Sequence, residues 1–129
     1  MVIGVNELDR EKLIRAWIAL QEVEEESAFY ERNLWAAEKL WEFSQDNPEL
    51  CWELILEILH REPSDKVLGS LAAGPLEDLL VTHGSEFIEK VERQASQDKR
   101  FRGLLSGVWK NEMSDDVWDR VQAVAQNNQ

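Results

Sequence analysis

The chain has 129 residues, of which 43% are hydrophobic and six are tryptophan, so it can bury one core and is not a disordered polypeptide. We therefore expect a single helical domain over residues 1–129. The net charge of −12 argues against direct binding to nucleic acid. A single cysteine, Cys51, excludes an internal disulfide, and no apolar run reaches the roughly 18 residues that a membrane span needs. The N-terminal sequence has no secretory pattern, so we expect a cytoplasmic protein.

Apolar residues recur at helical spacing from the N-terminus onward. Asn6 can cap a first helix, which ends in the acidic segment EVEEES. The predicted buried stripe of this helix is Leu13, Ile14, Trp17, Ile18 and Leu20. A second helix is predicted from about residue 28 to 44. Its predicted apolar side is Tyr30, Leu34, Ala37, Leu40, Trp41 and Phe43.

The segment DNPEL predicts the start of a third helix, with Asn47 as its cap and Pro48 as its first residue. This helix is expected to run to about residue 60. It should turn Cys51, Leu54, Ile55, Ile58 and Leu59 inward. A fourth helix is expected to begin after Ser64. We expect it to stop or kink at Gly74–Pro75, because proline lacks an N–H donor and its ring clashes with the preceding turn.

The stretch SLAAGPLEDLLVTHG, residues 70–84, contains the most distinctive residues of the chain. If Pro75 begins a new helix, Glu77 lies in its first turn, where its carboxylate can meet unpaired N–H groups. His83 would then lie in the last turn, and Gly84 would end the helix. Two alternatives for Glu77 stay open: an inward ion pair with Arg100 or Arg102, or a surface contact with a partner.

Three further caps are predicted in the C-terminal half. Ser85 can cap a segment that buries Phe87, Ile88, Val91 and Ala95, and Asp98 opens the next helix. That helix is expected to bury Phe101, Leu104, Leu105 and either Val108 or Trp109. Ser114 caps the last helix. About seven short helices result, and we expect an all-α fold, either an irregular antiparallel bundle or HEAT-like stacked helical hairpins.

No motif for metal, cofactor or nucleophilic chemistry is present. The two histidines and the cysteine do not stand at ligand spacing, and Cys51 lies on an apolar stripe, so we expect no metal and no cofactor. The 26 acidic residues make chance carboxylate pairs uninformative. A non-enzyme is therefore favoured. The enzymatic alternative places Glu77, His83 and Arg102 in a cleft at the Gly74–Pro75 break.

The tryptophans suggest an interaction surface. Trp17, Trp41 and Trp109 fall on predicted core stripes, whereas Trp35 and Trp52 lie off the stripes of their helices. Such residues are either sandwiched between helices, which is the favoured interpretation, or exposed as partner anchors. In the second case Glu24, Glu25 and Glu26 would surround the anchor.

The run from Leu71 to Trp109, LAAGPLEDLL…FRGLLSGVW, resembles a family of small bacterial helical proteins of unknown function. The residues that carry the resemblance are Ala73, Gly74, Pro75, Glu77, Leu80, His83, Gly84, Phe101, Arg102, Leu105, Val108 and Trp109. Upstream, LWAAEKLWEF and NPELCWELILEIL are similar to that family too. The resemblance implies a bacterial, cytoplasmic, all-helical protein, and it implies no activity or cofactor.

Charge and size together favour an interaction protein. Residues 1–60 carry 14 acidic and 5 basic side chains, a net charge of −9, whereas residues 61–129 carry a net charge of −3. We expect a domain that binds a basic protein partner, for example an immunity or antitoxin-type inhibitor. The alternative is a regulatory or scaffold protein that self-associates through exposed tryptophans into a homo-oligomer. No membrane contact is expected.

Overall fold

The computed structural model describes residues 7–126, and within that range the chain forms helices and no strand. The helices are α1 (Glu7–Gln21), α2 (Ala28–Asp46), α3 (Pro48–His60), α4 (Asp65–Leu71), the π-helical turn η1 (Ala72–Leu76), α5 (Glu77–Gln97), α6 (Lys99–Leu105) and α7 (Asp115–Gln126). The prediction of an all-α fold with about seven helices is confirmed. The predicted cap Asn6 lies outside the described residues.

Most helix starts follow the predicted capping residues. Ser64, Asp98 and Ser114 each accept a backbone N–H bond in the first turn of α4, α6 and α7. Pro48 is the first residue of α3, where its missing N–H costs no helical hydrogen bond. The side chain of Asn47 makes no capping hydrogen bond there. Local chemistry therefore determines where these four helices begin.

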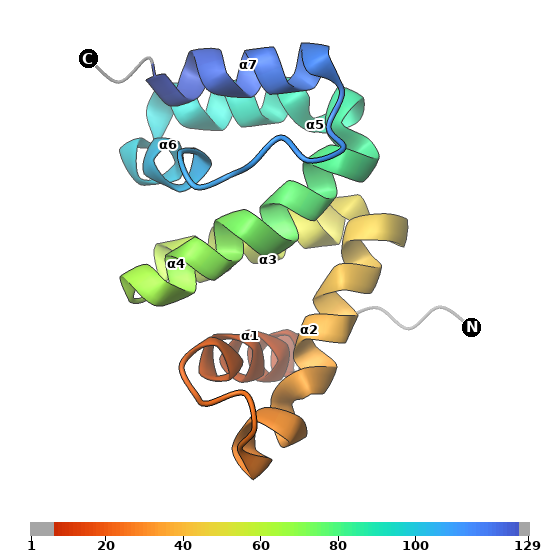
Figure 1. Ribbon diagram of the computed structural model, residues 1–129, viewed down its shortest axis with the longest axis vertical. Coiled ribbons are helices and arrows are strands. Elements are labelled where there is room, and N and C mark those ends of the chain that lie inside the picture. Colours follow the sequence, from red (N-terminus) through yellow and green to blue (C-terminus); the bar gives the residue numbers. More distant parts are fainter. Residues whose placement is uncertain (1–6, 127–129) are drawn as a thin grey trace.

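The helices lie in three levels along the long axis of the molecule (Figure 1). At one end α1 packs against α2, and α2 rises from there to the middle level. The middle level contains α3 and the α4–η1 segment. The other end contains most of α5 together with α6 and α7. The middle level is thus covered on both sides.

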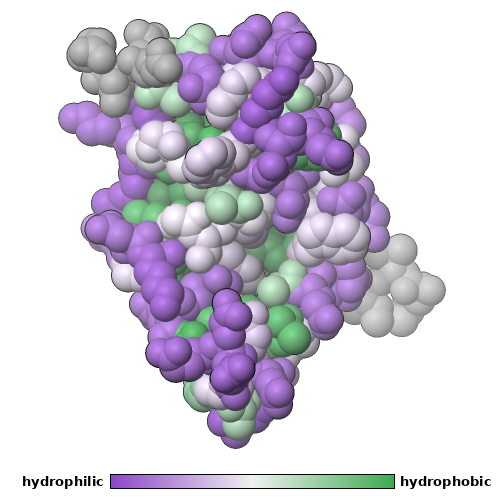
Figure 2. All heavy atoms as spheres, viewed as in Figure 1, coloured by the Kyte–Doolittle hydropathy of each residue, from purple (hydrophilic) through white to green (hydrophobic). Residues whose placement is uncertain are grey.

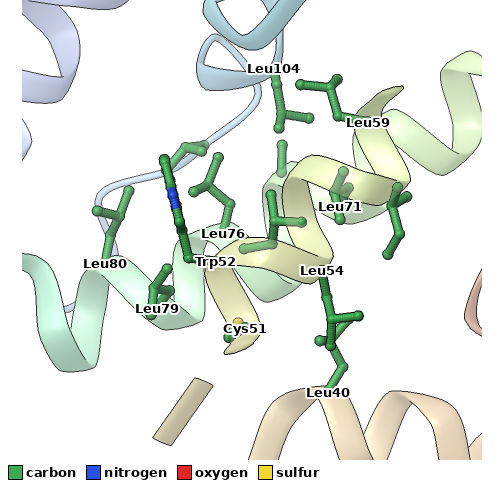
Figure 3. Close-up of a cluster of buried hydrophobic side chains, with 14 of the residues drawn as sticks. Leu40, Cys51, Trp52, Leu54, Leu59, Leu71, Leu76, Leu79, Leu80 and Leu104 are labelled. Atoms are coloured by element: carbon green, nitrogen blue, oxygen red, sulfur yellow. The ribbon is translucent and has the colours of Figure 1, made fainter. Parts of the chain in front are cut away.

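One hydrophobic cluster connects the three levels. Figure 3 shows its centre, where Leu54 of α3 and Leu40 of α2 point toward each other and Leu104 of α6 lies on the opposite side of α3. The predicted inward side of α3 is confirmed, since Cys51, Leu54, Ile55, Ile58 and Leu59 are all buried. Figure 2 shows the outside as mostly hydrophilic, with hydrophobic side chains gathered in the hollows between helices.

The expected break at Gly74–Pro75 is wrong, because the helix continues through it. The N–H of Glu77 donates to the carbonyl of Ala72, five residues earlier, so the chain widens by one residue into a π-helical turn. Pro75 is buried, and the wider turn accommodates a residue that has no N–H to donate. The local departure from helical geometry comes later, at His83, where φ is −125° and ψ is 27°.

The predicted helix boundary before Gly84 and Ser85 is present as a kink, because the non-helical backbone of His83 divides α5 into two helical parts, but Gly84 does not act as the helix-ending residue. Both residues lie inside α5, and none of the glycines among the described residues has the positive φ of a helix-ending glycine. A Cβ at Gly84 would lie 3.0 Å from both methyl carbons of Val117. The glycine therefore allows α7 to pack closely against α5.

Helices α5 and α7 run side by side in the same direction (Figure 1). Gly84 lies against Val117 near the start of α7, and Arg120 binds Glu92 further along both helices. This pair differs from the antiparallel arrangement that short connections favour. The reason is the loop of residues 106–114, which carries the chain back across the molecule before α7 begins.

Two tryptophans lie elsewhere than predicted, and a third, Trp52, follows the favoured prediction. Trp41 is 55% exposed and Trp109 is 72% exposed, although both were expected in the core. Leu40 and Trp41 are consecutive and therefore about 100° apart around α2, and the protein covers only the side of Leu40. Trp109 lies beyond the end of α6. Trp52 is buried between the rings of Phe87 and Phe101, so it is a sandwiched residue and not an exposed anchor.

Candidate functional site

Glu77 anchors the loop that joins α6 to α7. Its carboxylate is 7% exposed and accepts the backbone N–H of Trp109 at 2.9 Å and the side-chain amide of Asn111. We call this arrangement the Glu77 latch. It corrects the prediction that Glu77 caps a first turn. Helix α5 continues directly from η1, and the backbone N–H of Glu77 is already paired with the carbonyl of Ala72. The latch also corrects the prediction of an ion pair with Arg100 or Arg102.

The Glu77 latch brings together residues that are far apart in the motif. The π-helical turn with Gly74 and Pro75 directly precedes Glu77, and the N–H donor comes from Trp109. Asn111 adopts φ 43°, a left-handed conformation that asparagine tolerates better than most residues. The anchored loop leaves the Trp109 side chain mostly in solvent. The motif therefore organises a loop and not a catalytic cleft.

Glu77, His83 and Arg102 are not joined to one another by any hydrogen bond or ion pair that the structure describes. His83 Nε2 lies 2.8 Å from the carbonyl oxygen of Gln45, and its Nδ1 lies 3.0 Å from a carboxylate oxygen of Glu86. These contacts raise the pKa of His83, with the Glu86 contact the larger cause. Arg102 donates to the carbonyl of Ala95 at 2.5 Å. These three residues therefore do not form the cluster that the enzymatic alternative requires.

Cys51 and Asp78 are shielded groups and offer no nucleophile. Burial, with a smaller contribution from Asp78, raises the pKa of the Cys51 thiol to about 12, so it stays protonated near neutral pH. Burial and the neighbouring Glu77 raise the pKa of Asp78. Among the described residues no group of His, Cys, Asp and Glu side chains is arranged to hold a metal ion.

The outward side of α2 carries a row of apolar side chains. We call Tyr30, Leu34, Ala37 and Trp41 the α2 outer face. Leu34 is 38% exposed and Trp41 55%, whereas Tyr30 and Ala37 are half-buried. Four of the five large hydrophobic side chains exposed in the described part of the chain belong to α2: Phe29, Leu34, Trp35 and Trp41.

A hollow of about 540 Å³ lies within the α2 outer face. It is lined by Ala37, Glu38, Trp41 and Glu42, so the small alanine leaves room beside the indole. Glu38 and Glu42 border this open hollow, and the Glu42 carboxylate lies 3.8 Å from the Lys39 ammonium. An apolar floor with an acidic edge suits an apolar side chain that is followed by a basic one.

Trp35 lies on a different side of α2. It lines a groove of about 930 Å³ between α1 and α2, together with Phe29, Arg32 and Lys12. The Lys12 ammonium lies 5.9 Å from the centre of the Trp35 ring, and Arg32 lies over the ring of Phe29. These rings are partly covered by cations of the same chain, and Trp41 is more accessible.

Glu24, Glu25 and Glu26 lie exposed in the turn between α1 and α2. They precede Ser27, whose side chain caps α2 by accepting the N–H of Tyr30 at 3.0 Å. This acidic turn is therefore near the N-terminal end of the α2 outer face, and Glu31, Glu38 and Glu42 extend the negative charge along the helix.

The sequence interpretation missed the α2 outer face because it assigned those residues to the core. One signal was present: the helix has two apolar rows at helical spacing, and only one of them could face the single core. The buried row is Ala36, Leu40, Phe43 and Ser44. This row contains the polar Ser44, and the other row contains the large Trp41. Spacing alone therefore does not indicate which of the two rows faces the core.

In residues 7–126 no helix is both long and apolar enough to cross a bilayer. No curated protein and no solved structure matches the chain. A model of a family of unknown function, DUF6869, matches residues 22–129, which include the π-helical turn, the Glu77 latch and α2. Because this match covers most of the sequence, the chain belongs to that family.

Proposed function

We propose that this protein is a non-enzymatic interaction domain that binds a basic protein partner through the α2 outer face. The observation that carries the proposal is the exposure of Leu34 and Trp41 beside a hollow edged by Glu38 and Glu42. Exposed tryptophans in accessible hollows are frequent energetic anchors of protein interfaces. Burial of such a row by a partner removes apolar surface from water.

The charge of the chain sets the kind of partner. A net charge of −12 produces a negative field that accelerates encounter with a positive surface and weakens as salt screens it. Glu24, Glu25 and Glu26 add to this field next to α2. One specific form is an immunity or antitoxin-type inhibitor, in which the acidic face covers a basic site of another protein.

Self-association is the second candidate. Exposed indoles, Trp41 on α2 and Trp109 on the latched loop, would be the contacts of a homo-oligomer. The acidic side chains along α2 work against this alternative, because a symmetric contact brings like charges together. Light scattering of the purified protein separates the two, since the basic-partner proposal expects a monomer.

The test is affinity capture by the tagged protein from a lysate of its source organism, at low and high salt, read by mass spectrometry. Wild-type protein should retain one basic protein in stoichiometric amount and release it at high salt. Trp41→Ala should lose it, since anchor truncation costs about 2 kcal/mol or more, roughly 30-fold in affinity. Trp109→Ala is the matched control. Identical recovery by wild type and Trp41→Ala refutes the proposal.

A further inference from the structure

The spacing within the α2 outer face matches the seam of a helix pair. Tyr30, Leu34, Ala37 and Trp41 are separated by four, three and four residues. This is the alternation by which two helices pack along a common seam. At 1.5 Å per residue the row extends for about 16 Å, or three turns. A straight row of this length fits another helix lying along it.

An open, shallow hollow lies along this row. Ala37 and Trp41, two residues of the row that are about one turn apart, line it together with Glu38 and Glu42. Because Ala37 is small and Trp41 is 55% exposed, an apolar side chain of a facing helix can lie beside the indole.

The flanking charges decide between a second copy and another protein. Glu31 and Glu38 each follow a seam residue, seven residues apart, and neither forms an ion pair among the described residues. In an antiparallel pair of two α2 helices these glutamates would face each other. In a parallel pair they would face the flank of Asn33 and Leu40, and Leu40 is buried in its own chain.

We infer that the element recognised by the α2 outer face is an amphipathic helix of another protein. This helix has leucine-sized residues along its seam and lysine or arginine on the flank that faces Glu31 and Glu38. The inference rests on the proposed function and specifies the partner element. Basic side chains at these flank positions pair across the interface with the unpaired glutamates.

Three synthetic peptides of about 21 residues, six helical turns, provide the test. The first has leucine along the seam and lysine on both flanks, the second replaces each lysine by glutamate, and the third is the lysine peptide with two central prolines that prevent a helix. Binding to the full-length protein is measured by fluorescence anisotropy, and peptide helicity by circular dichroism.

The lysine peptide should bind at least about tenfold tighter than either of the others and gain helicity on binding. Trp41→Ala should weaken binding about tenfold or more, whereas Trp109→Ala leaves it unchanged. Glu31→Lys combined with Glu38→Lys should reverse the preference, so that the glutamate peptide binds better. This reversal cannot result from a folding defect, because a misfolded protein gains no ligand.

Several results would overturn the inference. Equal binding of the proline peptide would mean that the recognised element is extended, and no binding of any peptide would refute helix recognition. A dimer by light scattering that Trp41→Ala dissociates would assign the face to a second copy. If lysate capture still depends on Trp41 while the peptides fail, the proposed function stands and only the helical partner is wrong.

Discussion

Replacement of Glu77 by alanine tests whether the latch stabilises the fold. The substitution removes the acceptor of the Trp109 N–H at 2.9 Å and of the Asn111 amide. A hydrogen bond to a charged acceptor contributes about 1.5–3 kcal/mol to stability. Removal of the carboxylate also removes the free-energy cost of burying its charge, which offsets part of this loss. Because Glu77 is 7% exposed, we expect a net loss of about 2–4 kcal/mol.

Glu77→Gln separates the charge from the shape. The glutamine oxygen still accepts the Trp109 N–H, but its amide group faces the amide donor of Asn111, so we expect a loss of about 1–2 kcal/mol. Because the Glu77 charge contributes to the raised pKa of Asp78, this variant should also lower the pKa of Asp78.

The assays are urea unfolding followed by tryptophan fluorescence, amide hydrogen exchange over residues 106–114, and NMR titration of Asp78. Both variants should speed exchange of the Trp109 amide while the amides within α3 stay protected. The reasoning is refuted if both variants unfold within about 0.5 kcal/mol of the wild type and the Trp109 amide exchanges at its original rate.

Three more predictions follow from the packing and the titratable groups. Gly84→Ala should destabilise the protein by about 1 kcal/mol, because the new Cβ meets Val117 at 3.0 Å. The control Gly69→Ala places a Cβ that meets nothing within 4 Å and should stabilise the protein by about 0.5–1 kcal/mol. Equal effects of the two substitutions in thermal unfolding would contradict this prediction. The folded-state pKa of His83 is raised, so the stability that His83 contributes is present below pH 6.5 and is lost as pH rises through the raised value. His83→Gln should therefore flatten the dependence of the free energy of unfolding on pH between about pH 5 and 8, measured by urea unfolding. An unchanged dependence would exclude His83 as its source. Cys51 should resist iodoacetamide at pH 8 in the native protein and react after unfolding, so rapid native alkylation would contradict its burial.

The features that depend on neighbouring residues in the chain could be predicted. Ser64, Asp98 and Ser114 cap helices by bonds that reach only two or three residues ahead, so composition and spacing suffice to find them. The inward side of α3 could be predicted because that helix has one unbroken apolar face, which any core would cover.

Predictions failed where a residue's role depended on something distant. Gly74–Pro75 indicates a break by every local rule, yet buried Pro75 and Leu76 are held by packing, and the π-helical turn is the compromise between proline and a continuous helix. The acceptor role of Glu77 depends on donors 32 and 34 residues away. No local pattern contains that information.

The all-α fold, most helix starts and the negative charge could be predicted without coordinates, since each follows from short-range hydrogen bonding, periodicity or composition. Which of the two apolar rows of α2 is buried depends on the packing of the helices, because α1 and the middle level cover the side of Leu40 and leave Trp41 outside. The role of Glu77 as the anchor of a loop also depends on this packing. Both outcomes depend on which surfaces meet once the helices pack, and helix spacing does not specify that.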